Sequence, residues 1–132
     1  MFERTPEAGL LDVVEKEGIG CAVFSPLAQG LLTDRYLQGI PSDARAGKAH
    51  GFLRPEQVDE VRLAKVRALG AIAAERGQPL ASLALAWVLR DRRVTSAIIG
   101  ASKVSQLEQC VAAAASAPLG SEELKRIEAI LA

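Results

Sequence analysis

Two short apolar runs, at residues 19–24 and 95–100, place the strongest constraint on how this chain can fold. The first run is continuously apolar, which is typical of strands covered on both faces, as in parallel sheets. The segments around the two runs have helical periodicity, so helix and strand alternate along the chain. This alternation predicts parallel strands joined by crossover helices, and therefore a helix-rich α/β fold.

Helices are predicted where apolar residues recur three and four positions apart. The predicted helices cover residues 7–17, 55–76, 79–90, 104–115 and 121–131. The apolar residues expected on the buried faces of the first three are Ala8, Leu10, Leu11, Val14, Val58, Val61, Leu63, Val66, Leu69, Ile72, Leu80, Leu83, Ala84, Trp87 and Val88. Residues 25–54 are predicted to form a long loop with a short helical turn near 31–37, and loops of this length are more often functional than filler.

Composition and charge exclude several classes of function. Hydrophobic residues make up 49% of the chain and charged residues 24%, the usual balance for one packed domain in water. Sixteen basic residues balance sixteen acidic ones, so no overall field draws the chain to nucleic acid or to an anionic membrane. No secretory segment opens the sequence, and no apolar run approaches the roughly 20 residues that span a bilayer. A cytoplasmic location is therefore predicted.

The cysteines and the histidine do not form a metal-binding pattern. Cys21 and Cys110 lie far apart, and His50 is the only histidine. A structural zinc site needs four ligands at closer spacing, so no metal is expected. Both cysteines lie in apolar patterns, and we expect buried thiols that form no disulfide.

Two strands are too few for a stable parallel sheet of their own. A parallel pair leaves both sheet edges open and its apolar faces incompletely covered. We therefore expect residues 1–132 to form a single incomplete domain that belongs to a larger sheet or barrel. We also expect the isolated polypeptide to aggregate or to form oligomers, because it would expose apolar surface.

Candidate binding residues follow each predicted strand, where ligands gather in parallel sheets. In the first loop, Ser25 and Gln29 offer hydrogen bonds, Gly30 permits close approach, and Arg35 carries a charge that suits a phosphate. The alternative for this loop is a capped turn without a ligand.

The second loop ends in Gly100, Ser102 and Lys103 at the start of a predicted helix. Free backbone N–H groups at a helix start attract anions, and Lys103 adds a full charge. The alternative is that Ser102 is an ordinary N-cap beside a solvated Lys103. Two adjacent loops of this kind favour one extended ligand held between them.

Three segments resemble the aldo-keto reductases. FSPLAQGLLTDRY at residues 24–36 is similar to their loop after strand seven, and LALAWVLR at 83–90 to the helix before strand eight. IIGASKVSQLEQ at 98–109 is similar to their strand eight and the helix after it. The resemblance implies the C-terminal part of a (β/α)8 TIM barrel, from the end of strand six through strands seven and eight with their helices. The branch most similar contains the bacterial glyceraldehyde-3-phosphate and methylglyoxal reductases and the potassium channel β-subunits.

The resemblance implies that the cofactor is NADPH, because residues after strand eight surround a 2′-phosphate in the family. Phe24 matches the position beside the nicotinamide, and Arg45 a basic position near the adenosine phosphate. The implied cofactor-binding residues are Phe24, Ser25, Leu27, Gln29, Gly30, Arg35, Arg45, Gly100, Ser102, Lys103, Gln106 and Gln109. The family usually has Asn where this chain has Cys110, so one adenine contact is weakened.

Catalytic residues are not expected in this sequence. The family reduces carbonyls with a Tyr, Lys, Asp and His that belong to the first half of the barrel. Tyr36 and His50 match none of these positions, and we expect Tyr36 to be a packing residue and His50 a solvated loop residue. The implied substrates of a full-length protein are small aldehydes and ketones, and the family's homo-oligomers leave the assembly state open.

Three functions therefore remain open. The first is an NADPH-dependent reductase present as a C-terminal fragment that is inactive alone. The second is a non-catalytic, regulatory nucleotide-binding module like the channel β-subunits. The third is a self-sufficient α/β domain without a nucleotide site.

Overall fold

The fold is a helix-rich α/β arrangement built around two short parallel strands. A computed structural model describes residues 1–42, 44, 46 and 52–132. β1 (Ala22–Phe24) pairs in parallel with β2 (Ser96–Ile98), and the register sets Ala22 opposite Ser96 and Phe24 opposite Ile98. The helices are α1 (Leu10–Lys16), α2 (Glu60–Glu75), α3 (Leu80–Leu89), α4 (Val104–Ala114) and α5 (Ser121–Leu131). Short 3-10 turns occupy Thr5–Glu7, Ala28–Gly30 and Pro55–Gln57. The predicted parallel pairing is confirmed.

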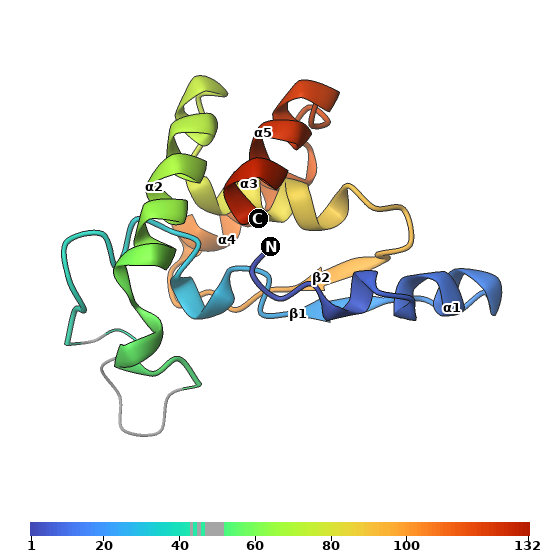
Figure 1. Ribbon diagram of the computed structural model, residues 1–132, viewed down its shortest axis with the longest axis horizontal. Helices are drawn as coiled ribbons and strands as arrows, with labels where there is room; N and C mark the ends of the chain where they lie inside the picture. Colours follow the sequence, from blue (N-terminus) through green and yellow to red (C-terminus); the bar gives the residue numbers. More distant parts are fainter. Residues whose placement is uncertain (43, 45, 47–51) are drawn as a thin grey trace.

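The helices surround α3 on several sides. In Figure 1, α2 and α5 stand on one side of α3, whereas β1, β2 and α1 lie on the other. α4 packs along α3, and β2 also contacts α3. As a result, the sheet has helices against one face, and β1 and β2 end close to the start of α4.

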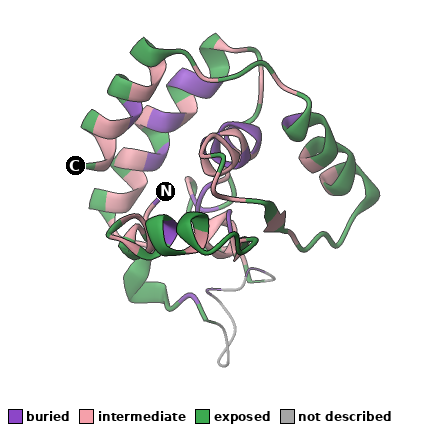
Figure 2. Cartoon of the chain, turned by 90° about the vertical axis from the view of Figure 1, so that its right-hand side faces the viewer, coloured by how far each residue is buried: buried purple, intermediate pink, exposed green. Residues whose placement is uncertain are grey.

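The hydrophobic core lies between α2, α3 and α5. Leu69, Leu83 and Ile127 are each fully buried, one from each of these helices. Figure 2 shows that buried residues concentrate on these helices, whereas α1 and the outer side of α4 are largely exposed. The predicted buried faces of α2 and α3 are therefore correct at most positions.

An ionic cluster joins the N-terminal segment to α3 and α5. The Arg4 guanidinium donates hydrogen bonds to Glu7 and to Glu128 of α5. Arg90, at the end of α3, lies over the Trp87 ring at 3.6 Å from its centroid and pairs with Glu7 at 3.6 Å. Stacking on a buried indole and pairing with carboxylates both hold these guanidinium groups in place.

The first predicted helix is shorter than expected. It begins at Leu10 rather than residue 7, because Gly9 adopts a left-handed φ of 117° that ends the preceding 3-10 turn. Of its predicted apolar face, Leu11 is buried, while Leu10 is exposed. The prediction of a buried Leu10 is wrong within the part of the chain that the structure describes, since α1 has no partner on that side.

The helix predicted from residue 55 begins instead at Glu60. Asp59 caps it, because its Oδ1 accepts a hydrogen bond from the Arg62 N–H at 2.7 Å. The predicted packing of Val61 is wrong, since this side chain is 70% exposed. It lies on the first turn of α2, before the helix reaches the core.

The long loop contains turns where a helical turn was expected. Residues 31–37 form no helix, yet Leu31, Leu32 and Tyr36 are buried in the core. The prediction of Tyr36 as a packing residue is confirmed. Arg45 and His50 lie outside the described residues. Both cysteines are unpaired as predicted but only half-buried.

The strands are shorter and more exposed than the apolar runs indicate. Each strand has three residues, and Phe24 is 81% exposed and Ile98 57% exposed. Other elements were expected to cover both faces of the sheet. Among the described residues, this expectation is wrong for the face that carries Phe24 and Ile98. Among the described helices, none is long and apolar enough to cross a membrane.

We expect Leu69→Ala to lower the free energy of unfolding by about 2–5 kcal/mol, because it leaves a cavity in a closely packed core. Urea unfolding followed by circular dichroism measures this change. Val61→Ala is the matched control on the same helix, and it should shift stability by less than about 0.5 kcal/mol. Equal effects of the two substitutions would contradict a core between α2, α3 and α5.

Candidate functional site

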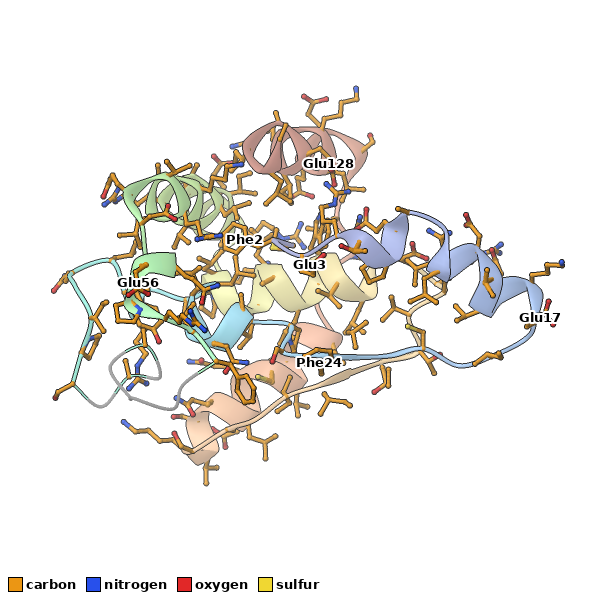
Figure 3. All side chains as sticks on the ribbon, turned by 60° about the horizontal axis from the view of Figure 1, so that its bottom comes forward. Phe2, Glu3, Glu17, Phe24, Glu56 and Glu128 are labelled. Carbon is orange, nitrogen blue, oxygen red and sulfur yellow. The ribbon has the colours of Figure 1, made fainter. Side chains whose placement is uncertain are left out.

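Two polar loops begin at the same end of the sheet, after the carboxyl ends of β1 and β2. Phe24 and Ile98 are register partners at the carboxyl ends of the parallel strands. The segment after Phe24 and the segment after Ile98 therefore begin side by side, although the sequence separates them by more than seventy residues. Figure 3 shows Phe24 at this end of the sheet, where its ring is largely exposed.

The first loop has an unusual backbone. Among the described residues, Ser25, Ala28 and Gln29 are the non-glycine positions with positive φ, at 50°, 48° and 60°. Such conformations are strained for residues with a Cβ and persist where the surroundings hold them. Here the Gln29 Nε2 donates to Ser25 Oγ at 2.7 Å across the turn. The two side chains predicted to contact a ligand therefore also stabilise the loop.

Tyr36 packs against this loop. Its ring lies 3.6 Å from where a Cβ on Gly30 would be, and its hydroxyl donates to the Gln29 carbonyl at 3.4 Å. Gly30 has a φ of 94°, a conformation that L side chains rarely adopt. Glycine at this position is therefore required by the backbone conformation. Leu27 is partly buried against the core beside it.

The second loop ends at the N-terminus of α4, and Gln106 caps that helix. Its Oε1 accepts from the Ser102 N–H at 2.9 Å, the Ser102 hydroxyl at 3.2 Å and the Lys103 N–H at 3.3 Å. The side chain at the third helical position thus satisfies backbone donors that a helix start otherwise leaves free. An anion at this loop would have to share or replace these hydrogen bonds.

Positive charge gathers at both loops. Lys103 is exposed at the start of α4, and among the described residues no carboxylate lies within ion-pair distance of it. Arg35 is exposed after the first loop, where its backbone N–H donates to Thr33 Oγ1. Charged donors at a helix N-terminus and a strained turn are suited to a phosphate group. Among the described residues of the two loops, no acid is paired with a base.

The structure does not bring every predicted residue to one point. Gly100, Ser102 and Lys103 are exposed around the start of α4, and Gln106 lies in the first turn of the helix. Gln109 is exposed another turn away. The predicted contact at Arg45 lies outside the described residues.

The strongest electrostatic perturbations lie elsewhere. Burial raises the pKa of Glu7, but hydrogen bonds and charge from Arg4 and Arg90 outweigh it and leave that pKa below its usual value. Hydrogen bonds from Arg93 lower the pKa of Asp91 to about 2. These groups are already compensated by ion pairs at the opposite end of α3 from the loops, so they are structural. Within residues 1–42, 44, 46 and 52–132, no group of His, Cys, Asp and Glu forms a metal site.

Sequence reasoning missed two features of this site. The cap from Gln106 has a signal in the sequence, because Gln at the third helical position is part of a capping box. The positive φ angles at Ser25, Ala28 and Gln29 have no such signal, since none of these residues is glycine or asparagine.

Comparisons with known proteins agree on the family. The profile of the aldo/keto reductase family matches residues 1–132. The chain is 45% identical over 126 residues to an L-glyceraldehyde 3-phosphate reductase of Escherichia coli strain K12. The matched segment covers 92% of this chain and 36% of that protein. It is 40% identical over 123 residues to a probable voltage-gated potassium channel subunit beta of Arabidopsis thaliana. This match covers 90% of this chain and 37% of that protein.

A solved structure is also similar. The glycerol dehydrogenase from Gluconobacter oxydans superposes with a TM-score of 0.77 at 29% identity, and the match covers 98% of this chain and 39% of that one. The chain therefore spans little more than a third of the length of the relatives it matches. Because the family profile covers every residue of the sequence, this chain belongs to the aldo/keto reductase family.

Proposed function

We propose that this chain supplies the nucleotide-phosphate-binding part of an NADPH-dependent reductase of small aldehydes and ketones. The observation that carries the proposal is the parallel register of Phe24 with Ile98. Because of this register, the two loops that carry groups suited to a phosphate begin at the same end of the sheet. The chain would form the C-terminal part of a TIM barrel, with the catalytic Tyr, Lys, Asp and His supplied by residues outside this sequence. The similarity to the reductase of Escherichia coli supports this reading.

The residues present fit a phosphorylated nucleotide. Lys103 offers a full charge, and Ser102 a hydroxyl, to a dianionic 2′-phosphate, whose charge distinguishes NADPH from NADH. Ser25 and Gln29 can donate to a pyrophosphate, and the exposed Phe24 ring offers a flat apolar face. When bound, the nucleotide supplies a hydride; the residues of this chain only hold and orient it.

A regulatory, non-catalytic module is the second candidate. The similarity to a probable potassium channel subunit beta favours it. Both candidates bind nucleotide through the same loops, and they differ in turnover once the catalytic residues are present. A cytoplasmic location and a homo-oligomeric state stay predictions for either.

We expect the Lys103→Ala variant to bind adenosine 2′,5′-bisphosphate at least about tenfold more weakly, because one charge-assisted hydrogen bond contributes about 1.5–3 kcal/mol. Titration calorimetry with this ligand and with 5′-AMP measures the difference. Affinity for 5′-AMP should change little, since it lacks the 2′-phosphate. Lys125→Ala, an exposed lysine on α5, is the control. If Lys103→Ala and Lys125→Ala bind alike, Lys103 does not hold the phosphate.

We expect Gln106→Glu to weaken binding of the same bisphosphate by tenfold or more without lowering the unfolding midpoint. The carboxylate can accept the same backbone hydrogen bonds and suits a helix N-terminus, yet it repels a phosphate there. Ser105→Glu adds the same charge to the same turn and serves as the control. An equal loss in both variants would assign the effect to net charge rather than to competition for the Ser102 and Lys103 amides.

We expect the 132-residue chain alone to show no NADPH-dependent reduction of L-glyceraldehyde 3-phosphate. No residue of the proposed catalytic set is present, so nucleotide binding would occur without hydride transfer. Absorbance at the nicotinamide band, with the Escherichia coli reductase as positive control, tests this. Turnover by the purified chain would overturn the assignment of catalysis to residues outside this sequence.

A further inference from the structure

The hydroxyl of Tyr36 joins two segments of the backbone. It donates a hydrogen bond to the Gln29 carbonyl and accepts one from the Ala46 N–H, both at 3.4 Å. The Tyr36 side chain is 1% exposed, and Ala46 is equally buried. Buried backbone groups need hydrogen-bond partners. One side-chain hydroxyl therefore serves a carbonyl and an amide from segments on either side of it in the sequence.

The turn that Tyr36 contacts has a backbone conformation that its own residues do not favour. Ala28 and Gln29 have φ angles of 48° and 60°, which residues with a Cβ seldom adopt. The Gly30 N–H and the Leu32 N–H both donate to the Leu27 carbonyl, at 2.9 Å and 3.2 Å, and close the turn. Strained conformations of this kind persist where surrounding structure holds them. The turn therefore depends on contacts from outside its own residues.

Tyr36 provides such contacts with both its ring and its hydroxyl. The ring atom Cε2 lies 3.6 Å from where a Cβ on Gly30 would be, so the ring packs directly against the turn. A return of Gln29 to an ordinary negative φ would reorient its peptide groups and disturb the hydrogen bond that its carbonyl accepts from the hydroxyl. Leu31 and Leu32 are also buried, so the base of the turn is fixed in the core.

We propose that Tyr36 is a positioning residue of the candidate site. Its ring and hydroxyl hold the turn at Ala28–Gly30 in the conformation that presents Ser25 and Gln29 to a ligand. Tyr36 itself is buried in the core, so it acts through the backbone of Gln29 rather than by touching the ligand. The inference rests on the proposed function for the identity of that ligand, the pyrophosphate of a nucleotide.

Amide hydrogen exchange tests the hold on the turn without any nucleotide. Tyr36→Phe keeps the ring against Gly30 and removes only the hydroxyl. We expect the Gly30 and Leu32 amides to exchange at least about threefold faster in this variant, because the turn opens more often. Amides within α5 should exchange as in the unchanged chain. NMR spectra of the isotope-labelled chain measure these rates. Unchanged rates in the turn, or equal acceleration in α5, would overturn the inference.

Nucleotide affinity tests the consequence for the site. Tyr36→Phe should bind NADPH at least about threefold more weakly, because a loosened turn must be ordered again when the pyrophosphate binds. Its affinity for 2′-AMP, which lacks the pyrophosphate, should be unchanged. Ser82→Ala removes a buried hydroxyl from α3 and is the matched control, with both affinities unchanged. Titration calorimetry measures all three proteins.

The two proposals give different results when they fail. If the unchanged chain binds NADPH and Tyr36→Phe binds it equally well, Tyr36 does not position the ligand and the inference is overturned. If the unchanged chain binds neither nucleotide, the proposed function is rejected. Hydrogen exchange then decides the inference alone, and acceleration confined to the turn supports it.

Discussion

Helix α3 must be buried on nearly every side, and the rest of the structure depends on meeting that requirement. Its sequence contains a single polar residue, Ser82, which is itself 6% exposed. An all-apolar helix is stable in water only as the centre of other elements. Here α2 packs against one side and α4 against another, and β2 contacts it too, while α5 packs against α2. Trp87 and Arg90 then fix its end to the N-terminal segment.

The position of α3 also determines where the candidate site lies. α3 leads into β2, and β2 pairs with β1 in parallel. The loops that follow the two strands therefore lie at the same end of the sheet. The polar groups of these loops are already hydrogen-bonded, Ser25 to Gln29 and the amides of Ser102 and Lys103 to Gln106. A phosphate would exchange these bonds for its own, so only the difference between the two sets of hydrogen bonds contributes to binding. In the proposed site, the charge of Lys103 would add to this difference.

The two apolar regions of the chain differ in what surrounds them. The core between α2, α3 and α5 is closed by side chains of this sequence, as full burial of Leu69 and Ile127 indicates. The exposed side chains of Phe24, Ile98 and Val111 are of similar type but have no cover among the described residues. The difference lies in the number of neighbouring elements rather than in hydrophobicity, because in the described part of the chain each strand pairs along one edge only.

The sequence by itself determined the order and type of the elements, their parallel pairing and the two loops of the candidate site. These follow from local periodicity, glycine and proline positions and the apolar character of segments such as residues 83–90. Only the tertiary structure decided that Val61 and Phe24 are exposed and that the Ser25 turn has positive φ angles. The exposure of a side chain depends on elements distant in the sequence, whereas periodicity depends on neighbours within a few residues.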